Sequence, residues 1–578
     1  MNTAAPRPER ADELDRDLET LHAKRTEWAR LPLSEKIALL ERVLACIGEA
    51  AAGQAADAIK AKGIPEGSPQ RGEEWLGGPM VQARVTRQLI EALRALKAHG
   101  HTGVTARHAR RLPSGQVAVR VFPNDLIDKV SFVGFSAELW LTPEASTDDW
   151  HRRTSSFNRP GGADEGGVAL VLGAGNVASI GLLDALHKLV VEGRVCFLKF
   201  NPVNDYLEPH YARALRPLIE RGFVRMCRGG AAEGAYLCQH PLVEEIHITG
   251  SDKTHDAIVY GVGAEGAARK ERDEPVCHKR LTSELGNVSP VLVVPGSWTA
   301  AELRFHAENV ATQMTNNAGF NCNAARVLVT QRDWPQRRAF LDALRAALRA
   351  VPRRPAYYPG ARDRFERFMA SEPNAERIEG AAGGAAGDAL GGAAPLPWGL
   401  IADVDPVGDH VCFTEESFCG LAVETALDAP DAASFLEEAT RFANERLWGT
   451  LNACVIIDPR TAKAHAAALE RAIQDLRYGS VCVNHWAALS YGMGVTAWGA
   501  FPGHTRQDIQ SGVGFVHNSY MLEGVQKTVV RGPFVVSPKP LWFATHRRCE
   551  QVAQALTQME VAPSLAKLPK VILGAARG

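Results

Sequence analysis

The sequence predicts an α/β protein that contains a doubly wound sheet of parallel strands. Residues 168–172 (VALVL) are consecutively apolar, as in a buried strand, and a turn containing Gly173 and Gly175 follows them. Residues 179–192 have the pattern of a helix, and residues 194–199 return to an apolar strand. Strand, helix and strand in this order form a βαβ unit, from which parallel doubly wound sheets are built.

The segments before this unit are expected to be helical first and then rich in strands. Apolar residues recur at spacings of three and four in residues 11–100, which predicts several amphipathic helices. Residues 117–122 and 137–141 are predicted strands. The polar, Gly-rich segment 146–167 predicts an exposed loop or arm.

The alternation of strands and helices continues after the βαβ unit. We expect a helix at 207–221, a strand near Val224, a strand at 245–249 and a helix at 252–260. These elements extend the same sheet.

Three regions follow from this pattern. Residues 1–284 are predicted to hold the N-terminal helices and the first sheet, and residues 285–485 a second α/β domain. Residues 486–578 are predicted to form a pocket loop, a return to the first domain and a late strand at 515–536. The Ala/Gly-rich segment Gly380–Ala394 is predicted to be a flexible surface loop.

Composition excludes several classes of protein. A chain of 578 residues is too long for one core, and its 46% hydrophobic and 23% charged residues are ordinary for a soluble protein. A net charge of −1 argues against a nucleic-acid binder. Eleven Cys without a CxxC pair or an apolar N-terminal segment favour reduced thiols and a cytoplasmic location. Polar and charged residues interrupt the apolar stretch 168–200, which argues against a membrane span.

Cys322 is the first candidate for chemistry. It lies in residues 317–326 (NAGFNCNAAR), where Gly319 permits a close approach of the backbone. A thiolate can attack a carbonyl carbon, although a lone Cys is more often a small buried hydrophobic residue. Upstream, Glu284 opens the turn ELGN at 284–287, and its carboxylate could activate water. Because the two motifs occur together, we favour Cys322 as a nucleophile and Glu284 as a general base. The alternative for Glu284 is an ordinary surface glutamate at a strand end.

Asn176 and Lys199 are the next candidates. Asn176 follows the first buried strand, and its amide could donate to the oxygen that becomes negative when sulfur attacks. The alternative for Asn176 is a helix cap. Lys199 ends the next strand, and its alternative is a solvated charge at a strand end.

Gly250 and Ser251 close the strand at 245–249 and open the helix at 252–260. Free backbone N–H groups at such a helix start can bind a pyrophosphate. The alternative is an ordinary N-cap serine.

Together these motifs resemble the aldehyde dehydrogenase superfamily, in the family's order, from about Val168 to Phe534. Residues 414–421 (TEESFCGL) also match its Glu-x-Phe turn. The resemblance implies a Rossmann-type dinucleotide-binding domain, an α/β catalytic domain and a small β oligomerisation element. It implies the following catalytic and cofactor-binding residues: Cys322 as nucleophile, Glu284 as base, Asn176 for the oxyanion, and Lys199, Gly250, Ser251, Glu416 and Phe418 for the cofactor.

The activity implied by the resemblance is oxidation of a small-molecule aldehyde to a carboxylic acid. The reaction passes through a cysteine thiohemiacetal and a thioester, which glutamate-activated water hydrolyses. Pro202 stands where the family often has a carboxylate near the cofactor ribose, so either NAD or NADP is expected. No metal is expected. The late strand joins subunits in the family, which implies a homodimer or homotetramer.

Two alternatives stay open. A coenzyme A-acylating aldehyde dehydrogenase or acyl-CoA reductase needs no water-activating glutamate, and Glu284 argues against it. A catalytically silent scaffold is suggested by the altered turns at 173–178 and Cys419. Four aromatic residues are predicted to line an apolar tunnel or to pack in the core: Trp486, Tyr491, Trp498 and Phe501.

Overall fold

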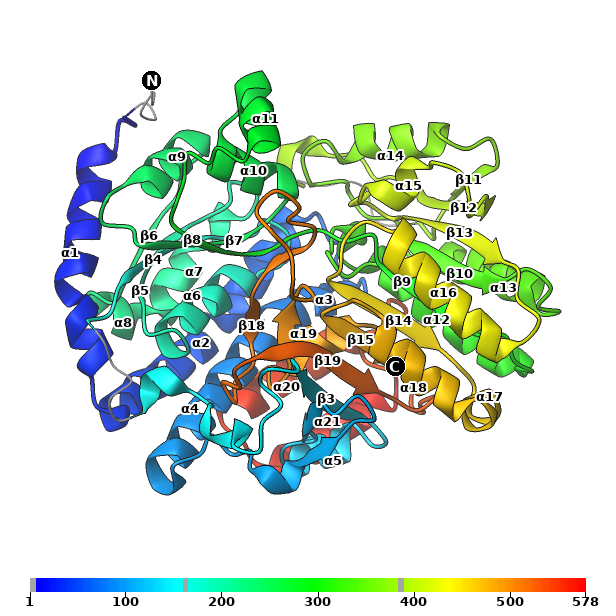
Figure 1. The fold of residues 1–578 in the computed structure, drawn as a ribbon, viewed down its shortest axis with the longest axis horizontal. Helices are drawn as coiled ribbons and strands as arrows, with labels where there is room; N and C mark the ends of the chain where they lie inside the picture. The colour runs from blue at the N-terminus through cyan, green and yellow to red at the C-terminus, as the bar shows by residue number, and fades with distance from the viewer. Residues whose placement is uncertain (1–6, 160–164, 383–388) are drawn as a thin grey trace.

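The computed structural model describes residues 7–159, 165–382 and 389–578. The chain forms two α/β lobes, each built around its own large sheet (Figure 1). This is the predicted fold class. Among the described helices, none has the length and apolar character needed to cross a lipid bilayer.

The smaller sheet is the predicted doubly wound one. Its strand order is β17-β8-β7-β4-β5-β6. The strands are β4 (Val168–Leu172), β5 (Val195–Lys199), β6 (Val224–Cys227), β7 (Glu245–Thr249), β8 (Arg280–Glu284) and β17 (Gly512–Val513). Strands β4 to β8 pair in parallel with their neighbours, and β17 pairs antiparallel with β8. Strands β4, β5 and β7 are almost wholly buried, as parallel strands covered on both faces require.

Helices cover both faces of this sheet. α1 (Ala11–Arg30) packs against β4, β5 and β6, and α6 (Ile180–Val190) packs against β4 and β5. The buried Trp28 of α1 donates from its indole N–H to the Leu189 carbonyl oxygen at 2.8 Å, which ties the N-terminal helix to α6. The other helices around this sheet are α2 (Leu33–Ala61), α4 (Val81–His99), α7 (Glu208–Ala214), α8 (Arg216–Glu220), α9 (Ala231–Gln239), α10 (Asp252–Tyr260) and α11 (Gly263–Arg272).

The larger sheet has eleven strands in the order β1-β2-β3-β19-β15-β14-β9-β10-β13-β12-β11. Its strands are β1 (Ala109–Arg111), β2 (Val117–Phe122), β3 (Ser136–Leu141), β9 (Pro290–Val293), β10 (Val327–Gln331), β11 (Ala375–Ile378), β12 (Trp398–Val404), β13 (Leu421–Leu427), β14 (Asn452–Ile456), β15 (Ser480–Val483) and β19 (Val525–Arg531). Its main helices are α12 (Ala300–Thr315), α13 (Arg337–Ala350), α14 (Ala361–Ala370), α16 (Ala432–Arg446) and α18 (Ala466–Asp475).

This sheet gathers strands from three separate parts of the sequence. β1, β2 and β3 lie within residues 1–284, which we assigned to the first domain, yet they belong to the larger sheet. β19 pairs antiparallel with β3 and parallel with β15, so both of its edges are used within the chain. Association of copies through this strand stays a prediction.

Two elements predicted as continuous are each divided in the structure. The helix expected at 207–221 is two helices, because Pro217 lacks the N–H that would continue the first one. The strand expected at 515–536 is β18 (Phe515–His517) and β19, which lie in different sheets. Residues with positive φ, including His517 and Asn518, end the first strand.

The segment 146–167 was predicted to be an exposed loop or arm, but its described part is packed against the rest of the protein. Its described part is irregular but packed, since Trp150, Thr154 and Asn158 are buried. Asn158 Nδ2 donates to the Val190 carbonyl oxygen at 2.7 Å, at the end of α6. Residues 160–164, and residues 383–388 of the predicted loop Gly380–Ala394, lie outside the described residues.

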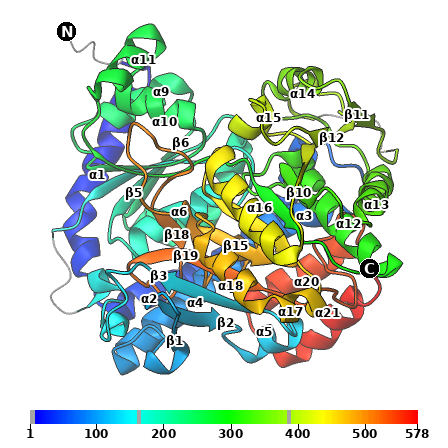
Figure 2. The same cartoon turned by 45° about the vertical axis from the view of Figure 1, so that its right-hand side comes forward.

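Two helices at the C-terminal end pack beneath the larger sheet. α20 (Cys549–Val561) contacts α3 (Arg71–Trp75) and α4, and α21 (Leu568–Ala575) packs on α20. Both lie next to α5 (Leu126–Ser131) in the two views (Figures 1 and 2). Segments far apart in the sequence therefore form one corner of the molecule.

Lys527 connects β19 to the C-terminal end of α18 within the larger lobe. Its side chain is buried, and Nζ donates to the carbonyl oxygens of Ile473, Gln474 and Leu476 at 3.0, 2.9 and 2.5 Å. These carbonyls belong to the C-terminal end of α18, where backbone acceptors lack partners within the helix and a cation is favourable.

We therefore expect Lys527→Met to lower the free energy of unfolding by about 1–3 kcal/mol, because buried helix-end carbonyls lose their donor. Guanidinium denaturation measures this. Lys463→Met, at an exposed position of α17 (Pro459–Ala464), is the control and should change little. Equal stability of the two variants would contradict the anchoring role.

Candidate active site

Asn176, Glu284 and Cys322 line one cavity of about 640 Å³. Asn176 follows β4 and Glu284 ends β8, so both stand at the carboxyl ends of strands of the smaller sheet. Cys322 comes from the segment after α12, which belongs to the larger lobe. The cavity thus receives side chains from both lobes.

The backbone before Cys322 has an unusual shape. Asn317, Ala318 and Gly319 have φ values of 53°, 58° and 81°, three successive residues in the left-handed region. A Cβ atom on Gly319 would lie 2.4 Å from the carbonyl carbon of Cys419. Only glycine fits there, because a side chain would collide with the backbone beneath the Glu-x-Phe turn.

The Asn176 side chain points at this same loop. Its Nδ2 donates to the Phe320 carbonyl oxygen at 2.9 Å. A side-chain amide carries two N–H bonds, so a second donor remains for a substrate oxygen beside Cys322.

Glu284 is buried beside Cys322, and burial raises the pKa of its carboxyl to about 8. A hydrogen bond with the Cys322 thiol lowers the pKa of Glu284, whereas the nearby carboxylates of Asp184 and Glu416 raise it. The pKa of the Cys322 thiol is itself well above its usual value, because of burial and the nearby Glu284. Without ligands, the neutral forms of both groups are therefore favoured at neutral pH.

A buried ionic network supports the catalytic loop, and it was not predicted from the sequence. Lys62 Nζ donates to both oxygens of Glu74 at 3.0 and 2.8 Å and to the Asn176 carbonyl oxygen at 3.0 Å. It also donates to Asn317 Oδ1 at 3.0 Å. One ammonium group thus connects the turn that contains Asn176 to the loop that precedes Cys322.

Glu73, Arg354 and Tyr357 complete this network. Glu73 accepts from the Asn317 backbone N–H at 2.9 Å and from Arg354 at 2.6 Å. The Tyr357 hydroxyl donates to Asn317 Oδ1 at 2.8 Å and reaches the Asn176 carbonyl oxygen at 3.3 Å. Glu73 and Arg354 are 281 positions apart in the chain, so no local pattern could have indicated the pairing.

The cofactor candidates from the smaller lobe lie at strand ends and a helix start. Lys199 ends β5 and is mostly buried, and its ammonium group forms no hydrogen bond or ion pair in the part of the chain that the structure describes. Ser251 caps α10 by accepting from the Thr254 N–H at 3.2 Å, the capping arrangement left open above. The Gly250 N–H donates to the Glu284 carbonyl oxygen at 3.0 Å.

Glu416 and Phe418 lie at the catalytic turns. A Cβ atom on Gly286 would lie 2.1 Å from Glu416 Oε2, so the ELGN turn needs its glycine to make room for this carboxylate. Burial raises the pKa of Glu416 to about 7, and Arg326 opposes the shift from 3.6 Å. The Phe418 ring lies 5.9 Å from the ring of Phe320.

These groups fit a dinucleotide. Within the described part of the chain, the buried Oε1 atom of Glu416 has no hydrogen-bond partner. The ammonium group of the buried Lys199 has no hydrogen-bond or ion-pair partner there either. Ribose hydroxyl groups could satisfy both. The residues that would hold the ribose groups of such a cofactor are therefore Lys199 and Glu416, and contact of Phe418 with the nicotinamide stays a prediction.

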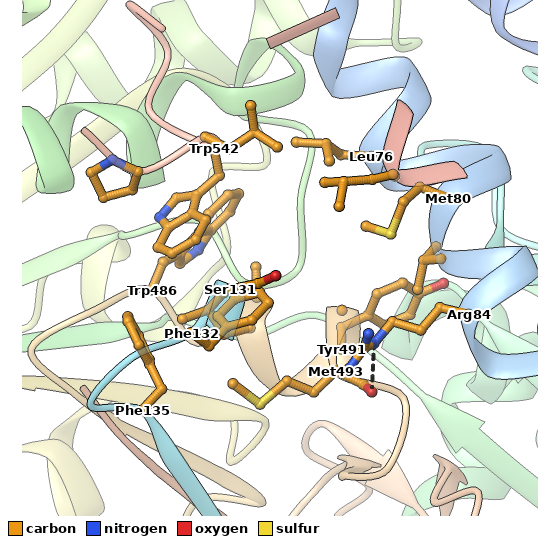
Figure 3. Close-up of a pocket in the computed structure, with 18 of the residues that line it drawn as sticks. Leu76, Met80, Arg84, Ser131, Phe132, Phe135, Trp486, Tyr491, Met493 and Trp542 are labelled. Atoms are coloured by element: carbon orange, nitrogen blue, oxygen red, sulfur yellow. Dashed lines mark hydrogen bonds between the residues drawn. The ribbon is translucent and has the colours of Figure 1, made fainter. Parts of the chain in front are cut away.

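Three of the four aromatic residues named above line the cavity. Trp486, Tyr491 and Trp498 belong to its wall, whereas Phe501 lies under the Lys527 ammonium group at 5.2 Å. Figure 3 shows Trp486 and Tyr491 on opposite sides of the cavity.

Comparison with known proteins decides the family. The model of the aldehyde dehydrogenase family matches residues 209–501. The chain belongs to this family. The match includes Glu284, Cys322 and Glu416, and begins after Asn176 and Lys199. No curated protein sequence matches the chain significantly.

Solved structures of aldehyde dehydrogenases share the fold. A putative aldehyde dehydrogenase from Burkholderia cenocepacia is 18% identical, with a TM-score of 0.60 over 90% of this chain and 91% of that one. An NAD-dependent aldehyde dehydrogenase from Sinorhizobium meliloti is 16% identical, with a TM-score of 0.57 over 91% and 88%. An NADP-dependent enzyme from E. coli is 18% identical, with a TM-score of 0.57 over 90% and 89%.

The buried network predicts that Tyr357→Phe lowers kcat about fivefold, because Asn317 and Asn176 lose one hydrogen-bond donor that orients their loops. Steady-state kinetics of aldehyde oxidation measure this, and the KM for the cofactor should stay unchanged. Tyr358→Phe is the matched control, since the Tyr358 ring packs on Phe418 and its hydroxyl has no hydrogen-bond partner among the described residues. The same loss of kcat in both variants would show that the network does not orient the loops.

Proposed function

We propose that the protein oxidises an aldehyde to a carboxylic acid, with NAD or NADP as oxidant, through a thioester on Cys322. The observation that carries this proposal is the single cavity lined by Asn176, Glu284 and Cys322. A sulfur nucleophile, an amide donor and a carboxylate are the groups that such a reaction needs.

The first step is addition of Cys322 Sγ to the carbonyl carbon, which forms a thiohemiacetal. Negative charge develops on the carbonyl oxygen, and the second N–H of Asn176 Nδ2 is the nearby donor that stabilises it. The thiol proton passes to solvent water as the sulfur adds, so Glu284 is not needed as a base in this step and can accept a proton in the next one.

The second step removes the acyl group from sulfur. A bound nicotinamide cofactor supplies the hydride acceptor that converts the adduct to a thioester. Glu284 then takes a proton from water, whose oxygen attacks the thioester carbon and releases the carboxylic acid and the thiol. The presence of this buried carboxylate beside Cys322 favours water over coenzyme A as acceptor.

Replacement of the nucleophile tests the proposal directly. Cys322→Ala should abolish aldehyde-dependent reduction of NAD and of NADP, measured by absorbance with each cofactor separately. Cys277→Ala, at another partly exposed cysteine, is the control and should retain full activity. Full activity of Cys322→Ala would refute the proposal. Activity that requires added coenzyme A would favour the acylating reaction, and a wild-type protein inactive with all aldehydes would favour a silent family member.

The raised pKa of Glu284 gives a prediction for pH. The carboxylate form, which acts as a base, is populated above the pKa of about 8, so hydrolysis-limited turnover should rise as pH increases and level off above that value. Glu284→Gln should show a burst of reduced cofactor equal to the enzyme present, followed by turnover reduced by about 100-fold or more. Glu415→Gln, at an exposed position paired with Arg367, is the control. Wild-type turnover in Glu284→Gln would exclude Glu284 as the base.

A further inference from the structure

The cavity that contains Cys322 extends far beyond the catalytic residues. Its volume of about 640 Å³ lies within the range of sites that hold a ligand of considerable size. Most of the side chains that line its wall are hydrophobic, as the labelled residues Met80, Phe132 and Trp542 illustrate (Figure 3). Representative residues of this wall, which we call the apolar chamber, are Met80, Phe132, Phe135, Trp542, Leu556 and Val571.

The chamber is built from segments outside the matched family region 209–501. α5 and the residues after it supply one side, and α20 and α21 supply the other. Ile127 of α5 and Leu541 pack on the buried cluster of these two C-terminal helices. The residues that define the chamber therefore lie outside the part of the chain that the family model matches.

The two basic residues that line the cavity are already neutralised. Arg84 donates to Asp128 at 2.8 Å, to Glu560 at 2.7 Å and to the Met493 carbonyl oxygen at 3.1 Å. All three ionic side chains are buried. A substrate carboxylate would have to displace one of these carboxylates to bind Arg84, which would leave a buried charge unpaired.

Lys539 is the second basic residue of the lining, and it has partners as well. Its Nζ donates to Glu308 at 2.8 Å and to the Thr545 hydroxyl at 2.9 Å. Among the described residues that line the cavity, none therefore presents an unpaired cation to an acidic aldehyde.

The mouth of the chamber is apolar too. Val130, Val133 and Val535 line the cavity and are 43%, 72% and 43% exposed. Large exposed apolar side chains gathered at a cavity mark a surface that contacts an apolar ligand. They continue the hydrophobic wall outward to the solvent.

We propose that the substrate is a neutral aldehyde with a long alkyl chain. Its carbonyl lies at Cys322, and its chain fills the apolar chamber between α5, α20 and α21. This inference rests on the proposed function. Since each buried methylene group contributes binding, kcat/KM should increase about fourfold per methylene until the chamber is full.

The test is a series of straight-chain aldehydes from butanal to dodecanal, with succinic semialdehyde and 4-aminobutanal as acidic and basic comparisons. Cofactor reduction should be most efficient with the longer alkanals, and the two charged aldehydes should be no better than butanal. A preference for either charged aldehyde, or kcat/KM independent of chain length, would overturn the inference.

A pair of variants tests where the alkyl chain of the substrate lies. Leu556→Trp, which places a larger side chain in the chamber wall, should lower the ratio of kcat/KM for dodecanal to that for butanal about tenfold or more. Leu573→Trp is the matched control, because Leu573 is 57% exposed on α21 and does not line the cavity. If Leu556→Trp left the ratio of kcat/KM for dodecanal to that for butanal unchanged, the alkyl chain would not lie in the apolar chamber.

Calorimetric titration with 1-dodecanol and 1-butanol separates this inference from the proposed function. Dodecanol should bind much more tightly than butanol, and Leu556→Trp should weaken its binding. If no aldehyde is oxidised but dodecanol binds in this way, the proposed function fails and the chamber stands as a site for long alkyl chains. If aldehydes are oxidised but dodecanol does not bind, only the chamber inference fails.

Discussion

The carbonyl oxygen of Asn176 is the point on which the arrangement of the active site depends. It accepts hydrogen bonds from Lys62 Nζ and from Asn317 Nδ2, and the Tyr357 hydroxyl lies 3.3 Å from it. The side chain of the same residue donates to the nucleophile loop in return. Through this one residue the turn after β4 and the loop before Cys322 are fixed relative to each other.

The loop before Cys322 needs this support because its backbone is strained. Three successive residues with positive φ include the non-glycine residues Asn317 and Ala318, a conformation that persists only when its surroundings hold it. Lys62, Glu73 and Tyr357 supply the hydrogen bonds that do so. The N-terminal segments, which carry none of the family's motifs, therefore help to hold the loop of the candidate nucleophile.

The site concentrates acidic groups in a place with little solvent. Glu284 is buried and the Glu416 side chain is only 11% exposed. Glu416 raises the pKa of Glu284, both carboxylates raise the pKa of the Cys322 thiol, and Arg326 lowers the pKa of Glu416. Such groups are unfavourable for stability and useful for chemistry, since a carboxyl with a pKa near 8 can take and return protons near neutral pH.

Sequence patterns alone were sufficient for the βαβ unit, for the alternation of strands and helices from 168 to 249, and for the family resemblance of the segments around Glu284, Cys322 and Glu416. Each of these depends on residues close together in the chain. They could not reveal that β1 to β3 join the larger sheet, that residues 150–158 are packed, or that one predicted late strand is two. Nor could they identify Lys62, Glu73, Arg354 and Tyr357, or the chamber under α20 and α21. Those features consist of contacts between segments hundreds of positions apart, and the free energy that selects them comes from burial and ion pairing that exist only once the chain is folded.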